Sequence, residues 1–136
     1  MARPPVILDA SVAIASILEP GRGHAAAFAR WAQEDRMKLV PASFWSETAN
    51  GLLVGNHVDA GEVRGHLTDL FELGVEVADR GLDGVLEAVD LAAQHRLTVY
   101  DALYLQLAID TDATLATLDR DLGRAAADVG IELEAL

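Results

Sequence analysis

The sequence predicts an α/β fold in which helices cover both faces of a parallel β-sheet. Short apolar runs alternate along the chain with amphipathic helical patterns, and this alternation is typical of a parallel sheet covered on both sides. The length of 136 residues suits one domain. Because no linker or internal repeat divides the chain, we expect a single domain over residues 1–136.

Five short apolar runs predict the strands of this sheet. The first is rich in β-branched residues, follows two prolines and ends at Asp9. The second ends at Pro41, and the fourth ends at Asp119. In chain order, the predicted strands are residues 6–8, 39–40, 75–78, 114–118 and 131–133.

The segments between the strands carry apolar residues at spacings of three and four, the periodicity of an amphipathic helix. Ser43 can cap the third helix, and Gly55 stands where that helix would end. Thr98 and Asp101 resemble a capping box before residues 102–109, which are so apolar that they must be largely buried. In chain order, the predicted helices are residues 10–18, 24–34 and 43–55, a helix striped by Val63, Leu67, Leu70 and Phe71, a helix striped by Leu82, Val85, Leu86 and Val89, and residues 102–109 and 121–129.

The composition excludes several classes of function. The chain has no cysteine, which rules out disulfides, thiolate zinc sites and cysteine nucleophiles. The lack of cysteine also fits the cytoplasmic location that we expect. The apolar stretch 97–109 is interrupted by Asp101 and is shorter than the roughly 20 residues that a membrane span requires, so we expect no membrane segment. A net charge of −12 disfavours indiscriminate binding to phosphate polymers. If the protein binds RNA, a divalent metal or a basic partner must offset its carboxylates.

Four acidic residues are expected to meet at one edge of the sheet. Asp9 and Asp119 each follow an apolar strand, and Glu47 and Asp101 fall in the first turns of helices that begin near that edge. Four ionised carboxylates in one pocket need a cation, and oxygen ligands suit Mg²⁺ or, as a substitute, Mn²⁺. Such an ion activates water, so the pattern indicates phosphodiester hydrolysis.

Three of the four acids also have a structural interpretation. Asp119 can cap the helix that follows it, Asp101 can complete a capping box, and Glu47 can interact with a helix dipole. Asp9 has no such structural need at the end of a buried strand. The occurrence of all four at one predicted edge therefore favours a functional site.

Four segments around these acids resemble the ordered motifs of PIN-domain ribonucleases. They are VILDAS around Asp9, PASFWSETAN around Glu47, YDALYL around Asp101 and LATLDRDL around Asp119. The order of the motifs and the length of the chain are most similar to the VapC-type toxins of bacterial toxin–antitoxin pairs. The resemblance spans nearly the whole chain.

This resemblance implies a metal-dependent endoribonuclease that acts as a toxin. By motif position, the catalytic residues would be Asp9, Glu47, Asp101 and Asp119. The aspartates would bind Mg²⁺, and Glu47 would orient or deprotonate the water. Ser11 and Thr117 match hydroxyl positions that often line such sites and would bind substrate. The implied partners are RNA of the transfer or ribosomal class, a VapB-like antitoxin and a second copy of the chain in a homodimer.

Two other classes of function remain open. A PIN-like domain that only binds RNA or protein would have the same fold, although the presence of all four acids argues against lost chemistry. A phosphohydrolase of the Asp-x-Asp type expects an acid two residues after Asp9, where Ser11 stands. A receiver domain expects a lysine near the acidic pocket, but the only lysine, Lys38, lies at the start of a predicted strand.

Overall fold

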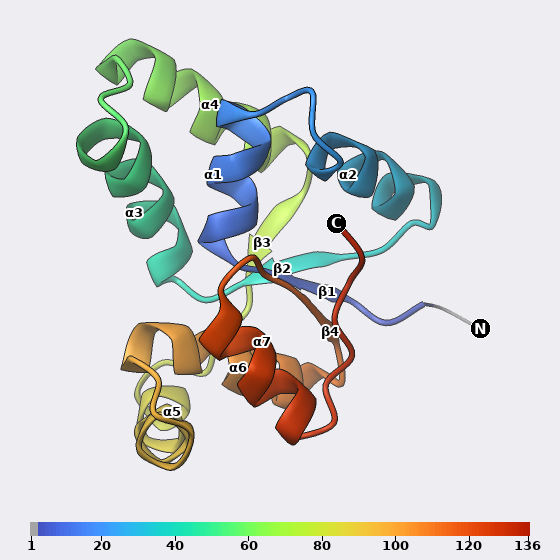
Figure 1. Cartoon of the computed structure of the whole chain (residues 1–136), viewed down its shortest axis with the longest axis vertical. Coiled ribbons are helices and arrows are strands. Elements are labelled where there is room, and N and C mark those ends of the chain that lie inside the picture. The colour runs from blue at the N-terminus through green and yellow to red at the C-terminus, as the bar shows by residue number, and fades with distance from the viewer. Residues whose placement is uncertain (1–2) are drawn as a thin grey trace.

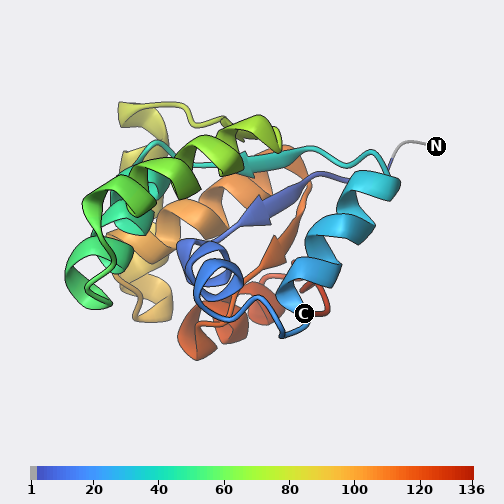
Figure 2. The same cartoon turned by 90° about the horizontal axis from the view of Figure 1, so that it is seen from above.

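A computed structural model of the chain describes residues 3–136 and has the predicted α/β architecture (Figure 1). Four parallel strands form one sheet in the order β3-β2-β1-β4. The strands are β1 (Val6–Leu8), β2 (Lys38–Val40), β3 (Val75–Val77) and β4 (Thr114–Ala116). Figure 2 shows β1, β2 and β4 running in the same direction, so their carboxyl ends meet at one edge.

Helices cover both faces of the sheet. In Figure 1, α1, α2 and α4 lie on one side, whereas α6 and α7 lie on the other, with α5 packed outside α6. The helices are α1 (Ala10–Leu18), α2 (His24–Gln33), α3 (Ser43–Asn50), the π-helix η1 (Gly51–Gly55), α4 (Ala60–Glu72), α5 (Leu82–His95), α6 (Val99–Thr111) and α7 (Arg120–Asp128). Within residues 3–136, none of them is long and apolar enough to cross a bilayer.

The core lies between the sheet and its two helical layers. The strands β1, β2 and β4 are buried along their whole length, as expected for a parallel sheet covered on both faces. The largest fully buried side chains are Trp31 of α2, Tyr104 of α6 and Phe44 of α3. The prediction that residues 102–109 are largely buried is confirmed, because most of this stretch of α6 packs in the core.

Two strand predictions in the C-terminal part are wrong. Residues 131–133 do not form a strand, because only Leu133 pairs, through an isolated bridge to Leu115 of β4. The chain makes one backbone hydrogen bond to Leu115 on each side of this bridge and then leaves the sheet. The strand predicted over 114–118 ends at Ala116. Thr117 leaves the strand, and its hydroxyl donates a hydrogen bond to Asp9 at the carboxyl end of β1.

The predicted cap of the third helix is also wrong. Ala42 occupies the N-cap position of α3, and the buried hydroxyl of Ser43 has no hydrogen-bond partner among residues 3–136. The carboxylate of Asp79, which follows β3, accepts from the backbone N–H of Ala42 at 2.7 Å and so satisfies this end of the helix. The helix does end at Gly55 as predicted, after it has widened into η1.

Helix α5 turns its large apolar side chains outward. Its small residues Gly84, Ala88 and Ala92 are buried, and Ala88 and Ala92 pack with Ala102 of α6. The striping residues are instead exposed by 36–71%. They are Leu82, Val85, Leu86 and Val89. We call these four residues the α5 outer face; an apolar surface of this kind is typical of an interaction site.

A buried ion pair joins the C-terminal segment to the start of the sheet. The guanidinium of Arg36 contacts both carboxylate oxygens of Glu134 at 3.1 Å, and the two side chains are only 5% and 10% exposed. Arg36 also donates to the carbonyl of Pro4 and to the hydroxyl of Thr114, both at 2.9 Å. The indole N–H of Trp31 donates to Glu134 at 2.8 Å. The network therefore links α2, β4 and both ends of the described chain.

Candidate active site

Asp9 lies at the carboxyl end of β1, directly before α1. The residue is only 4% exposed. Its carboxylate oxygen Oδ2 accepts hydrogen bonds from Ser11 Oγ at 2.6 Å and from Thr117 Oγ1 at 2.7 Å. Asp9 occupies the N-cap position of α1 but makes no side-chain capping bond there. The carboxylate is therefore held in place by hydroxyls rather than used to satisfy the helix end.

The two hydroxyls also tie Asp9 to the turn between β4 and α7. Ser11 Oγ accepts from the backbone N–H of Leu118 at 3.1 Å, and Thr117 Oγ1 accepts from that of Asp119 at 3.0 Å. Each hydroxyl thus donates its hydrogen to Asp9, and its oxygen accepts a hydrogen bond from a backbone N–H in the turn at residues 118–119. This arrangement makes Ser11 and Thr117 positioning residues for Asp9; their expected contact with substrate stays a prediction.

We predict that Thr117→Val weakens the binding of divalent metal by about 10–100-fold, because groups that orient a metal ligand typically contribute that much. The change keeps the shape of the side chain but removes the hydrogen bond to Asp9. Calorimetric titration of wild type and variant with Mn²⁺ measures the effect. Thr68→Val is the matched control, since the Thr68 hydroxyl bonds only within α4. Equal affinities in Thr117→Val and wild type would contradict the prediction.

Asp119 and Asp101 each lie at the start of a helix. Asp119 is the N-cap of α7, and its Oδ1 accepts from the backbone N–H of Leu122 at 2.9 Å. Asp101 lies in the first turn of α6, and its own N–H donates to Thr98 Oγ1 at 3.1 Å. The structural interpretations of both acids thus hold in part. Capping uses one carboxylate oxygen of Asp119 and leaves the other available.

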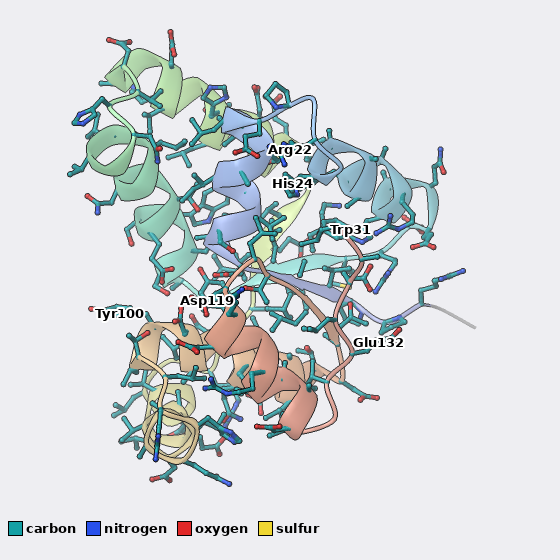
Figure 3. All side chains as sticks on the ribbon, in the orientation of Figure 1. Arg22, His24, Trp31, Tyr100, Asp119 and Glu132 are labelled. Atoms are coloured by element: carbon teal, nitrogen blue, oxygen red, sulfur yellow. The ribbon has the colours of Figure 1, made fainter. Side chains whose placement is uncertain are left out.

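Figure 3 labels Asp119 at the start of α7 and Tyr100 at the start of α6. In this orientation the two helix starts lie on the same side of the molecule. Asp101 and Asp119 are close enough for their charges to interact. The carboxyl edge of the sheet therefore brings acids from separate parts of the chain to one place.

Glu47 reaches this edge from α3, but it lies in the second turn of that helix and not in the first turn as predicted, because the helix begins at Ser43. Tyr104, which the sequence-based prediction did not include, holds it there. The hydroxyl of Tyr104, fully buried on α6, donates to Glu47 Oε2 at 3.2 Å. Glu47 Oε1 is buried and has no hydrogen-bond partner among the described residues. Tyr104 follows Asp101 by three residues, which places both on one face of α6, and this spacing is the signal that could have identified it.

The carboxylates raise each other's proton affinity. Burial is the main cause that raises the pKa of Asp9, Glu47 and Asp101, and the charges of neighbouring acids raise it further. Asp9 interacts in this way with Asp119, Glu47 with Asp9 and Asp101, and Asp101 with Asp9 and Asp119. The hydroxyls of Ser11 and Thr117 act in the opposite direction on Asp9. The structure therefore brings all four predicted acids into one electrostatic neighbourhood.

The chemistry of these donors fits a hard divalent cation. None of the four acids forms an ion pair within residues 3–136, and a buried carboxylate oxygen of Glu47 lacks a donor. Oxygen ligands with excess negative charge suit Mg²⁺ or Mn²⁺. No three His, Asp or Glu side chains in the described part of the chain already surround one point as metal ligands. The acids thus share a neighbourhood without a preformed coordination sphere.

We predict that Asp9→Asn stabilises the protein at neutral pH when EDTA keeps it free of metal. The pKa of Asp9 is raised on folding, so its favourable contribution is present at low pH and is lost as pH rises through the folded pKa. The advantage of the variant should therefore be small near pH 4, where a free aspartate titrates, and should grow as the pH rises toward neutrality. Urea unfolding of both proteins across this range measures it, and a difference that is constant with pH would contradict it.

A cavity lies elsewhere, between α1, α2 and α4. It has a volume of about 630 Å³ and a mostly apolar lining that includes Ile17, Phe28 and Leu70. Lys38, at the amino end of β2, also lines it. None of the four acids contributes to this apolar groove, so it is not part of the carboxylate site.

A parallel sheet with helices on both faces and acids gathered at the carboxyl ends of β1 and β4 defines the class as a PIN domain. The chain matches the PIN domain family over residues 6–128 and belongs to that family. The family resemblance and the fold class predicted from the sequence are both confirmed.

Two solved structures have a similar fold. One is PAE2754 from Pyrobaculum aerophilum, with a TM-score of 0.69 and 21% identity over 90% of this chain and 86% of that one. The other is VapBC2 from Rickettsia felis bound to a DNA fragment from its promoter, with a TM-score of 0.70 and 16% identity over 95% of this chain and 96% of that one. No curated protein sequence matches this chain.

Proposed function

We propose that this protein is an endoribonuclease that depends on Mg²⁺ or Mn²⁺ and acts as the toxin of a toxin–antitoxin pair. The observation that carries the proposal is the buried Asp9 carboxylate, which two hydroxyls hold near three further acids. None of the four acids forms an ion pair within residues 3–136. Membership of the PIN domain family and the likeness to the VapBC2 fold support it.

The four acids would have two tasks in phosphodiester hydrolysis, metal binding and proton transfer. Asp9, Asp101 and Asp119 would hold the ion, which when bound supplies Lewis-acid chemistry at the phosphate. Ser11 and Thr117 would keep Asp9 oriented. Glu47 would take the proton of the attacking water at Oε1, and burial raises its pKa toward the range that suits a general base. The Tyr104 hydroxyl would hold Glu47 in position through Oε2.

The partners follow from the same proposal. We propose one domain over residues 1–136 that acts in the cytoplasm on RNA of the transfer or ribosomal class. A VapB-like antitoxin would inhibit it, as the VapBC2 relative suggests by its name. A net charge of −12 complements a cationic inhibitor segment, and the apolar groove offers a place for apolar side chains of the same partner.

We also propose a homodimer that forms through the α5 outer face. Its four exposed aliphatic side chains would be covered by the same face of a second copy. We predict that Leu86→Glu shifts the protein to monomer, because each copy would bury a charge in the interface. Sedimentation equilibrium measures the mass, and Leu53→Glu is a control at an exposed apolar residue of η1. A Leu86→Glu variant of unchanged dimeric mass would refute this interface.

Cleavage of total cellular RNA tests the proposed function directly. Protein free of antitoxin is incubated with Mg²⁺, with Mn²⁺ and with EDTA, beside Asp101→Asn. The proposal expects discrete fragments that require the metal and vanish in the variant. Intact RNA in every reaction, from folded protein that binds Mn²⁺, would instead favour a PIN domain that binds without cutting.

A further inference from the structure

Most cations of this acidic chain are neutralised by carboxylates. The sequence has 10 Lys and Arg residues. Within residues 3–136, the cationic side chains that form no ion pair are Lys38, Arg64, Arg96 and Arg120. Arg120 directly follows Asp119, and Arg96 precedes the cap of α6 by two residues. Two of the unpaired cations therefore lie close along the chain to acids of the carboxylate site.

Arg96 has a left-handed backbone conformation, which is unfavourable for arginine. It is the C-cap of α5, with φ 58° and ψ 44°, where glycine or asparagine is the usual residue. The other described non-glycine residues with positive φ are Asp35, His57 and Asp112, whose types tolerate this region better. The exposed Arg96 side chain makes no hydrogen bond or ion pair within residues 3–136 that would offset the strain. Strain without an internal reason is typical of functional positions.

Arg96 shares a cavity with a second arginine. The cavity has a volume of about 350 Å³ and lies between the end of α5 and helix α7. It is lined by Gln94, His95, Arg96, Arg124 and Asp128. The guanidinium of Arg124 donates to the carbonyl of His95 at 3.3 Å, which fixes it beside Arg96.

The cavity adjoins the carboxylate site through the first turn of α7. Arg124 also donates to Asp121 at 2.9 Å. Asp121 lies two residues after Asp119 and close enough to Asp101 for their charges to interact. These two bonds use only part of the five N–H donors of Arg124, so the guanidinium can still bind an anion.

We infer that Arg96 and Arg124 bind a backbone phosphate of the RNA next to the bond that is cut, an inference that rests on the proposed function. Guanidinium groups match the geometry of phosphate oxygens and bind them through paired hydrogen bonds. A chain of net charge −12 repels RNA overall, so its attraction for the substrate must come from local cations beside the bound metal. Asp128 on the cavity wall repels a phosphate, so binding depends on direct hydrogen bonds from the two guanidinium groups.

The test measures RNA binding separately from cleavage. All variants carry Asp9→Asn, and a fluorescein-labelled single-stranded RNA of mixed sequence is titrated in Mg²⁺ at several salt concentrations. Arg96→Gln and Arg124→Gln should each weaken binding and reduce the slope of log affinity against log salt by about 0.7–1. Arg64→Gln, which removes an unpaired cation on α4, should change neither quantity.

Arg96→Gly separates binding from a purely structural role. Glycine accepts the left-handed conformation, so the melting temperature should not fall, while RNA binding should weaken as in Arg96→Gln. A melting temperature that falls together with binding would overturn the inference. So would slopes in Arg96→Gln and Arg124→Gln equal to that of Arg64→Gln, even if wild type cuts RNA. Binding that depends on the arginines without any cleavage by wild type would support the inference and refute the proposed function.

Discussion

Asp9→Asn should lower the rate of RNA cleavage by about a hundredfold or more. The substitution keeps the shape of the side chain but removes the charge that would hold a divalent ion, and a catalytic metal typically contributes several kcal/mol to the transition state. Asp9 is also the most buried of the four acids and accepts two short hydroxyl hydrogen bonds. Initial rates of fragment formation from cellular RNA, at saturating Mg²⁺, measure the loss.

Two comparisons make this result specific. Asp112→Asn is the matched control, because Asp112 lies away from the site at the end of α6, in a left-handed conformation that asparagine tolerates. It should retain the activity of wild type. Asp9→Asn should also remain folded, and in EDTA at neutral pH it should be the more stable protein. If Asp9→Asn is folded and cuts RNA at the rate of wild type, Asp9 is not part of the catalytic site.

Arg36→Met should destabilise the fold by about 3–5 kcal/mol, the typical cost of leaving one member of a buried ion pair without its partner. Glu134 would keep the bond from Trp31 and a longer, half-exposed contact with Arg30 at 3.8 Å, but it would lose both contacts with the buried guanidinium of Arg36. The carbonyl of Pro4 and the hydroxyl of Thr114 would lose a donor as well. Urea unfolding gives the free energy. Arg80→Gln should cost far less, because its ion pairs lie at the surface and are screened by solvent.

Arg36→Met should also change how the stability of the protein depends on pH in the acid range. Burial acts to raise the pKa of Glu134, but hydrogen bonds from Arg36 and Trp31 and the charge of Arg36 outweigh it, so the pKa lies below its usual value. The contribution of Glu134 to stability is therefore present above its unfolded pKa and is lost as pH falls through the lowered folded pKa. Arg36→Met should abolish this loss. Identical acid unfolding curves for variant and wild type would contradict the assigned role of the pair.

The places of Asp9, Asp101 and Asp119 in the fold could be predicted from the sequence because each occupies a locally defined position. Asp9 and Asp119 end apolar runs, and Asp101 follows a capping threonine by three residues. Strand length, helix start and cap depend on interactions within a few residues, which a sequence pattern displays. The order of such positions along the chain was enough to predict the sheet edge where they meet.

The contacts that give the acids their geometry could not be predicted in the same way. Thr117 and Asp9 are 108 residues apart, and Tyr104 and Glu47 are 57 apart, so no local pattern pairs them. Nor does any local pattern show that the packing of β4 beside β1 directs the hydroxyls of Ser11 and Thr117 onto Asp9.

By itself, the sequence determined the α/β class, the parallel strands and the four acids at their carboxyl edge, because periodicity and capping are local properties. Only the tertiary structure decided which face of α5 is buried. The large apolar stripe predicts an inward face, but the small residues Ala88 and Ala92 allow closer packing on α6 and leave the stripe outside. Likewise, only the fold pairs Arg36 with Glu134 across 98 residues. Burial and long-range pairing depend on which surfaces meet, and that is settled when the elements pack together.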